Sequence, residues 1–288
     1  MAAANDASDG RIREPEIQRE EILFLDDDAF TPEHVCLVTG AASGIGRAAA
    51  VAAAANGLRV AAIDVDVDGL ERTVAVAEKF GGDVVPLTAD LTRDDDVSAA
   101  VEKAAGLGTV SFLANIAGIQ HIDAVEDFPM ETYDRMHKLM LRAPFLLSKL
   151  CIPLMKQSSS GRGVIGNMAS IHAHICTVRK SVYNITKFGL RGLTQSIAAE
   201  GGGHIRSFSV SVGFVATPLA LKQVPAQAKQ RGITEEAVVR EVMMGKSRTK
   251  EMMVPIEVAN LFLFGFSRFS RCLVGGDLLF DGGVVLTY

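Results

Sequence analysis

The chain has 288 residues, of which 48% are hydrophobic and 22% are charged, and its formal net charge is −5. This length and composition suit one α/β domain with a large core. No apolar run approaches the ~18 to 20 residues of a membrane helix, so we expect no membrane span. No basic cluster with interleaved aromatic residues is present, so we do not expect the protein to bind nucleic acid.

Residues 1–33 differ in composition from the remainder, since they hold ten acidic residues and three arginines. We expect an acidic N-terminal extension over 1–33, followed by a single domain over 34–288. The extension lacks the regions of a signal peptide and is acidic where transit peptides are Arg-rich, which predicts a cytoplasmic protein. Its apolar stretch, Ile22 to Leu25, either docks on a neighbouring subunit or on the domain's own surface, or stays solvated.

The first expected unit of the domain is a phosphate-binding strand–turn–helix, VCLVTGAASGIGRAAAVAAAANG from Val35. Its glycines permit a tight turn and close approach of a pyrophosphate to the helix N-terminus. The residues expected to contact the cofactor in this turn are Gly40, Ser43, Gly44, Ile45 and Gly46.

The next expected strand, LRVAAIDV, ends in Asp64, near where an acidic residue meets the ribose hydroxyls of a dinucleotide. A carboxylate there repels a 2′-phosphate, and Ser43 offers no positive charge to hold one. The pattern therefore favours NAD over NADP. The alternatives are a plain glycine turn and a solvated strand end.

Apolar strands alternate with amphipathic helices from Val35 to Leu279. This alternation predicts a Rossmann-like, doubly wound, three-layer α/β/α fold with a mostly parallel seven-stranded sheet, and a ligand outside the carboxyl ends of the strands. The expected strands are VCLVT, RVAAIDV, DVVPLTA, VSFLANIAG, GVIGNMAS, RSFSVSVG and DLLFDGG.

Catalytic chemistry is expected between Ser170 and Lys187. Tyr183 and Lys187 are four residues apart on a predicted helix, so their side chains share a face. The ammonium favours the phenolate and draws the pKa of Tyr183 toward neutral, which makes Tyr183 a candidate general acid/base. Ser170 ends a buried strand, where its hydroxyl can meet a substrate oxygen. Alone, this Tyr–Lys spacing is also that of an ordinary helix.

These motifs together resemble the short-chain dehydrogenase/reductase family over roughly residues 33 to 288. TGAASGIG, NIAG at 115–118, Ser170 and YNITK at 183–187 occur in the family's order and spacing. The resemblance implies that Tyr183 transfers the proton, that Lys187 lowers its pKa and binds the nicotinamide ribose, and that Ser170 polarises the substrate oxygen. It also implies a homotetramer, and further cofactor contacts at Asp90, Leu91, Asn115, Gly118, Gly213, Val215 and Thr217.

One position departs from the family pattern. Met140 stands where the family usually has an asparagine that contributes to a proton relay. A thioether cannot relay a proton. The departure leaves a non-catalytic nucleotide-binding or scaffolding protein as an alternative.

A closer resemblance, to bacterial D-3-hydroxybutyrate dehydrogenases, concerns the substrate. It rests on AGIQ at 117–120, SIHAH at 170–174, KSVY at 180–183 and TPLALKQVPAQAKQRGITEEAVV from Thr217. It implies NAD-dependent interconversion of (R)-3-hydroxybutyrate and acetoacetate, with 217–250 as a substrate lid. The substrate contacts would be Ser170 and Tyr183 at the reacting oxygen and Gln120, His172, Lys180 and Gln223 at the carboxylate.

A polar pocket suits this substrate, because a small anion is held chiefly by charge-assisted hydrogen bonds. Each of the four carboxylate-binding residues also has an ordinary surface or loop interpretation. The alternative enzymes are relatives acting on a polyol, a steroid or a 3-oxoacyl thioester.

Neither disulfides nor a metal site are expected. The four cysteines, Cys36, Cys151, Cys176 and Cys272, form no C-x-x-C pair, which predicts reduced and mostly buried thiols. His172 and His174 lack accompanying ligands at metal-site spacing.

Overall fold

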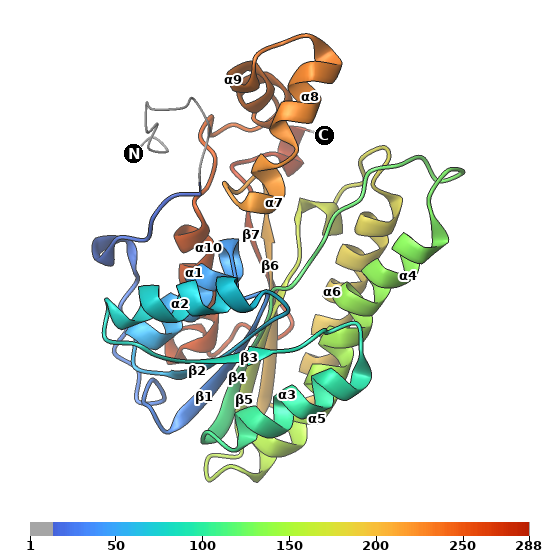
Figure 1. Ribbon diagram of the computed structural model, residues 1–288. Coiled ribbons are helices and arrows are strands. Elements are labelled where there is room, and N and C mark those ends of the chain that lie inside the picture. The colour runs from blue at the N-terminus through green and yellow to red at the C-terminus, as the bar shows by residue number, and fades with distance from the viewer. Residues whose placement is uncertain (1–13, 288) are drawn as a thin grey trace.

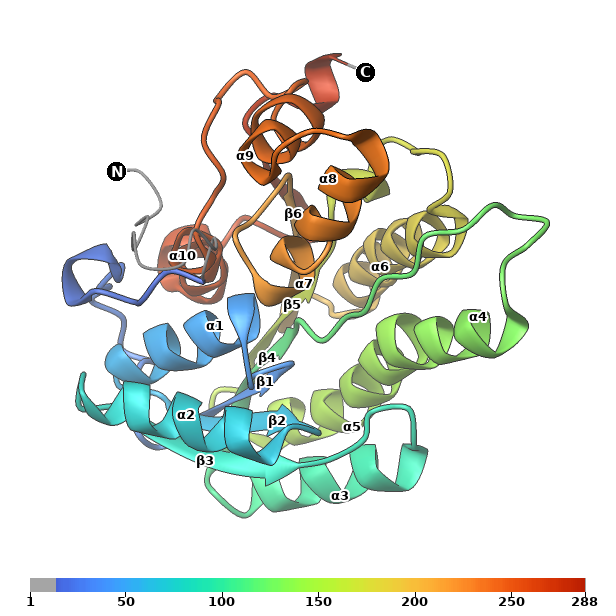
Figure 2. The same ribbon diagram turned by 45° about the horizontal axis from the view of Figure 1, so that its top comes forward.

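The computed structural model describes residues 14–287 as one sheet of parallel strands with helices on both faces. Figure 1 and Figure 2 show two views of this three-layer arrangement. The strands are β1 (His34–Thr39), β2 (Arg59–Asp64), β3 (Asp83–Thr88), β4 (Thr109–Asn115), β5 (Gly163–Met168), β6 (Ile205–Val212) and β7 (Asp277–Phe280). The larger helices are α1 (Gly44–Ala55), α2 (Val67–Glu78), α3 (Asp94–Ala105), α4 (Met130–His137), α5 (Ala143–Gln157), α6 (Ser181–Glu200), α8 (Val224–Arg231) and α10 (Pro255–Phe266).

The strand order is β3-β2-β1-β4-β5-β6-β7, and each neighbouring pair is parallel. This confirms the predicted doubly wound fold, with a sheet that is parallel throughout. The chain winds outward in one direction from β1 to β3 and in the other from β4 to β7. The switch therefore lies between β1 and β4, where folds of this kind open a crevice for a ligand.

Alternation along each strand divides the core into two halves. In β1, Val35 and Leu37 face one hydrophobic cluster with α3 and α5, while Cys36 and Val38 face the other with α1 and α10. A strand buried on both sides has no polar face, which explains the uninterrupted apolar run from Val35 to Val38 in β1. The central strands β1 and β2 are largely apolar because helices cover both faces of the sheet, whereas β6 carries buried serines at 207, 209 and 211.

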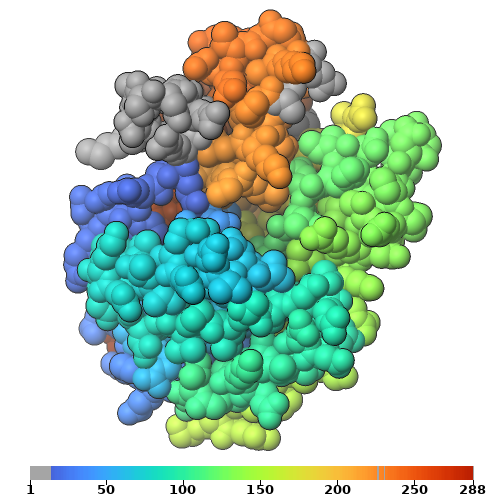
Figure 3. Space-filling view, viewed as in Figure 1, coloured from blue at the N-terminus to red at the C-terminus, as the bar shows by residue number. Residues whose placement is uncertain are grey.

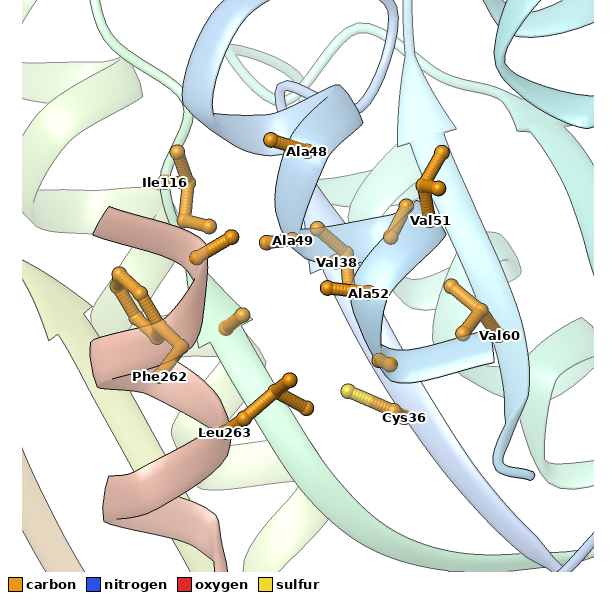
Figure 4. Packing of buried hydrophobic residues seen from close by; sticks show 14 of the residues in the cluster. Cys36, Val38, Ala48, Ala49, Val51, Ala52, Val60, Ile116, Phe262 and Leu263 are labelled. Atoms are coloured by element: carbon orange, nitrogen blue, oxygen red, sulfur yellow. The ribbon is translucent and has the colours of Figure 1, made fainter. Parts of the chain in front are cut away.

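The alanines of α1 let a second helix pack closely beside it. Figure 4 shows Ala49 and Ala52 on the face of α1 that lies between Val38 of β1 and the α10 residues Phe262 and Leu263. Small side chains on α1 allow its backbone to approach α10 closely. The large side chains that fill the space between these helices and the sheet come from α10 and include Phe262. The beginning of α1 is thereby held at the carboxyl end of β1.

A separate small unit follows β6. It contains α7 (Pro218–Leu221), α8, α9 (Glu235–Ala237) and a π-helical turn (Val238–Met243), with its own apolar cluster that includes Val224, Val238 and Met243. In the space-filling view of Figure 3 this unit, in orange, rises above the blue-to-green body of the molecule. It stands beyond the carboxyl ends of the strands, on the side where the ligand crevice opens.

None of the helices within residues 14–287 combines the length and apolarity that crossing a bilayer requires.

We predict that Phe262→Ala destabilises the fold by about 3–5 kcal/mol, because the ring is buried against Phe208 and Phe266 and its loss leaves a cavity. Urea unfolding followed by circular dichroism measures the change. Phe264→Ala on the same helix is the control, since Phe264 is 36% exposed and should cost far less. Equal losses in the two variants would contradict this account of the core.

Candidate active site

A pocket of about 410 Å³ opens at the carboxyl ends of the strands. Nearly all the residues predicted for cofactor, substrate and catalysis line it, although they come from segments spread between residues 40 and 223. Asn115 is the exception. Its side chain is buried, its amide nitrogen donates to Asn167 Oδ1 at 2.9 Å, and its own oxygen has no hydrogen-bond partner in the described chain.

The glycine-rich turn is shaped by close backbone approach. Gly40 and Gly44 both have positive φ, +70° and +55°. A Cβ on Gly46 would stand 2.0 Å from the carbonyl oxygen of Gly40, so a side chain there would force the turn apart. The turn presents Ser43 and the first amides of α1 to the pocket, the geometry by which a helix N-terminus receives phosphate. These residues fit the diphosphate of a dinucleotide cofactor.

Asp64 holds this turn from the neighbouring strand. One carboxylate oxygen accepts a hydrogen bond from Ala42 N at 3.1 Å, and the other accepts from Val65 N at 2.7 Å. The side chain still lines the pocket, where it can meet ribose hydroxyls. Asp64 thus has a structural contact that the sequence pattern did not reveal.

Helix α6 places Tyr183 and Lys187 on one face, as their spacing predicts. The Lys187 ammonium lies 5.3 Å from the centre of the Tyr183 ring and donates to Met168 O at 2.7 Å. Lys187 is only 3% exposed, and burial lowers its pKa to about 8. The ammonium of Lys187 is therefore still mostly charged at neutral pH, although burial makes that charge costly.

The pKa of Tyr183 differs from the sequence-based prediction. Burial raises it to about 12, and a hydrogen bond from Ser170 offsets only part of that shift. The expectation that Lys187 draws this pKa below its ordinary value is wrong for the protein in this state, because desolvation of the phenolate outweighs the favourable contacts. The phenol stays protonated at neutral pH, which suits a proton donor.

Ser170 is part of a chain of polar contacts that runs through His172. The serine hydroxyl lies 3.1 Å from His172 Nδ1, and His172 Nε2 lies 2.9 Å from the Thr177 hydroxyl. Burial, followed by the charges of Lys180 and Lys187, lowers the pKa of His172 to about 3, so the ring is neutral. With both nitrogens engaged, His172 positions Ser170. Thr177 was missed, since nothing in its spacing marks it.

The remaining predicted substrate residues gather at the other end of the pocket. Gln223 donates to the Gln120 side-chain oxygen at 3.0 Å, which joins the small unit after β6 to the loop after β4. Burial lowers the pKa of Lys180. Within residues 14–287 its ammonium has no hydrogen-bond or ion-pair partner. An enclosed cation without a partner is a ready site for an anionic group.

Apolar side chains that the sequence did not single out complete the pocket. Phe214, Leu219 and Met243 line it from the segment after β6. Met140, by contrast, does not line the pocket. It is fully buried in a π-helical turn, Lys138–Arg142, with its sulfur 3.4 Å from where a Cβ on Gly118 would stand.

Two smaller expectations concern cysteine and metal. Cys36 and Cys151 are buried, but Cys176 and Cys272 are exposed, so the prediction of mostly buried thiols holds for half of them. Cys176 lies outside the pocket lining. Over the described part of the chain, no three His, Cys, Asp or Glu side chains are grouped so as to hold a metal ion.

The sequence and the fold are similar to those of known oxidoreductases. Residues 40–285 match the family described as enoyl-(acyl carrier protein) reductase. The chain is 36% identical over 253 residues to the D-beta-hydroxybutyrate dehydrogenase of Rhizobium meliloti, covering 86% of this chain and 96% of that protein. It is 32% identical over 269 residues to the D-threitol dehydrogenase of Mycolicibacterium smegmatis, covering 92% and 97%. The crystal structure of levodione reductase superposes with a TM-score of 0.82 at 26% identity, covering 90% and 100%.

We predict that Tyr183→Phe abolishes carbonyl reduction with a nicotinamide cofactor but leaves NADH binding within about twofold, because only the transferable proton is removed. Steady-state kinetics and NADH fluorescence titration measure the two effects. Tyr133→Phe is the matched control, since Tyr133 does not line the pocket. Turnover by Tyr183→Phe comparable to that of the wild type would show that another group transfers the proton.

We also predict opposite pH dependences for the two directions. With the pKa of Tyr183 raised, the phenolate needed to oxidise an alcohol becomes more abundant as pH rises. The rate of oxidation should therefore climb between roughly pH 6 and pH 9, while reduction, which uses the phenol, should not climb. Initial rates in both directions across this range provide the test, and an oxidation rate that falls with pH would contradict it.

Proposed function

The chain belongs to the short-chain dehydrogenase/reductase family, and from that premise we propose that it interconverts (R)-3-hydroxybutyrate and acetoacetate with NAD. The observation that carries the proposal is the enclosed ammonium of Lys180, which has no hydrogen-bond or ion-pair partner within residues 14–287 and lies in the same pocket as Tyr183 and Ser170. A short keto acid has a carbonyl and a carboxylate only a few bonds apart. The pocket offers a proton donor for the first and a cation for the second.

The carboxylate of the substrate is assigned to the polar end of the pocket. Lys180 supplies the charge, while the amides of Gln120 and Gln223 supply hydrogen-bond donors. These two amides bond to each other in the free protein, so the substrate would replace a weak neutral contact with charge-assisted ones. His172 is assigned an indirect part, because it holds the Ser170 hydroxyl toward the reacting oxygen.

The mechanism follows from the positions of the polar groups. In reduction, Tyr183 donates its proton to the substrate carbonyl oxygen, and Ser170 donates a hydrogen bond that stabilises the charge developing there. In oxidation, the phenolate of Tyr183 accepts the hydroxyl proton. A bound nicotinamide supplies the hydride in one direction and accepts it in the other. Lys187 is assigned to the nicotinamide ribose, and its charge favours the phenolate.

The proposed cofactor is NAD. Asp64 lines the pocket at the end of β2, where it would meet the ribose hydroxyls and disfavour a 2′-phosphate. The cofactor residues proposed beyond the glycine turn are Asp90, Leu91, Gly118, Gly213, Val215 and Thr217, which line the same pocket. Asn115 would act through the backbone of the segment it anchors.

Three further features belong to the proposal. The unit over 217–250 is assigned as a substrate lid, because it carries Gln223 and Met243 into the pocket. A homotetramer is supported by exposed apolar residues on α5 and α6, Phe145, Ile185 and Phe188. A cytoplasmic location is supported by cysteines that are all free.

A second candidate is a relative that acts on a polyol or a longer substrate. Phe214, Leu219 and Met243 favour the longer substrate, since they give the pocket an apolar wall that a four-carbon acid does not need and that a polyol would not use. A panel of alcohols and ketones with NAD and NADP distinguishes the two. Fast oxidation of NADH with acetoacetate supports the first candidate. NADH binding without reduction of any carbonyl would favour a non-catalytic protein.

We predict that Lys180→Gln raises the KM for acetoacetate about 10- to 100-fold with a smaller change in kcat, because a charge-assisted hydrogen bond to the carboxylate is lost. The KM of Lys180→Gln for an uncharged ketone of similar size should differ little from that of the wild type. Lys222→Gln is the matched control, since Lys222 is exposed and does not line the pocket. An unchanged KM in Lys180→Gln would show that Lys180 does not bind the carboxylate.

A further inference from the structure

The residue that precedes Lys180 has an unusual backbone conformation. Arg179 has a φ of +63°, and within the described part of the chain it is the only residue other than glycine with a positive φ. This left-handed conformation suits glycine and is tolerated by asparagine, but it costs free energy in most other residues. A residue keeps it only where the surrounding structure holds it there, and such residues gather at functional sites.

Asp123, in the loop between β4 and α4, holds Arg179 through its backbone and through its side chain. Asp123 N donates to Arg179 O at 2.9 Å, and Arg179 Nη2 donates to Asp123 Oδ1 at 3.3 Å. Asp123 also forms an isolated parallel β-bridge with Lys180. Its side chain is only 26% exposed, and its Oδ1 accepts a further hydrogen bond from Ala124 N at 2.9 Å. Figure 2 shows this loop, in green, alongside α6.

The turn at Arg179 sends two neighbouring side chains to different places. The side chain of Arg179 is 59% exposed, whereas Lys180 lines the pocket. Helix α6 begins at the next residue, Ser181, and Lys180 O accepts from Asn184 N at 2.8 Å in its first turn. Lys180 therefore stands between a fixed turn and a fixed helix, so the direction of its side chain depends on the conformation of Arg179.

The loop that holds Arg179 also carries Gln120. Gln120 is three residues before Asp123, lines the pocket and accepts a hydrogen bond from Gln223. The contacts of Asp123 thus set the position of Lys180 relative to the two amides assigned to the substrate carboxylate. The Asp123 carboxylate pairs with Arg179 and not with Lys180, which leaves the Lys180 ammonium available to an anion.

We propose that Arg179 is a positioning residue whose left-handed conformation, held by Asp123, directs the Lys180 ammonium toward the substrate carboxylate. This inference rests on the carboxylate site proposed above. A side chain that rejects a positive φ would let the backbone relax and turn Lys180 away from the carboxylate. Tyr183 and Ser170 are held by other contacts, so the chemical step would be affected less than substrate binding.

The test compares two substitutions at Arg179 that differ in their tolerance of a positive φ. Arg179→Val introduces a β-branched residue, for which this conformation is strongly disfavoured, and should raise the KM for acetoacetate about three- to tenfold with little change in kcat. Arg179→Asn loses the same guanidinium but tolerates the conformation, and its KM should stay within about twofold of the wild type. Equal KM values in the two variants would contradict the proposal.

A matched control is Arg162→Val. Arg162 is exposed, does not line the pocket and has no positive φ, so the same substitution there should leave the KM unchanged. Thermal unfolding of each variant confirms that it is folded when the kinetics are measured.

A double-mutant cycle tests whether Arg179 acts through Lys180. In a Lys180→Gln background, Arg179→Val should raise the KM no further, because the ammonium that it misplaces is already absent. Increases that multiply in the double variant would overturn the proposed role.

A crystal structure of Arg179→Val separates this inference from the proposed function. A Lys180 ammonium displaced from the pocket wall supports the positioning role of Arg179, even if the wild type does not reduce acetoacetate and the proposed substrate is wrong. An unmoved ammonium contradicts that role, whatever the substrate is.

Discussion

The active site depends on one hydrogen bond between a helix and a strand, from the buried Lys187 ammonium to the Met168 carbonyl at 2.7 Å. Met168 ends β5, and Ser170 follows two residues later. The bond fixes the beginning of α6 against the end of β5, so it sets the position of Tyr183 opposite Ser170. A buried ammonium without such an acceptor would be costly, which makes this contact a strong constraint on the packing of α6.

The same burial decides the charge state of the site. Lys187 and Lys180 both have lowered pKa values because they are desolvated, and their charges help keep His172 neutral. A neutral imidazole can accept a hydrogen bond at one nitrogen and donate at the other, as its contacts with Ser170 and Thr177 require. Lys180 and Lys187 therefore add two buried positive charges to a pocket that Arg135 also lines, and bound anions would relieve the cost of burying the two lysines.

The sequence predicted most of this arrangement because the relevant signals are local. Glycines in a turn, an acidic residue ending the next strand and a Tyr–Lys pair one helical turn apart each follow from backbone geometry. Contacts between distant segments were not predictable in this way. The bond between Gln120 and Gln223 spans 103 residues, and that between Glu14 and Gly44 spans 30. The pKa of Tyr183 was predicted in the wrong direction because spacing shows a neighbouring charge but not the depth of burial.

Met140 illustrates how a departure from a family pattern is accommodated by packing. Met140 is fully buried and packs in one apolar cluster with Met136 and Val182. Tyr183 packs against this cluster. The tyrosine therefore has an apolar side, formed by the α4–α5 region, and a polar side, formed by Ser170 and His172. A polar group at position 140 would need a hydrogen-bond partner within this cluster, whereas the thioether needs none. The methionine thus leaves one side of Tyr183 apolar and the Ser170 side polar, so the proton transfer proposed for Tyr183 would rely on the residues that follow β5.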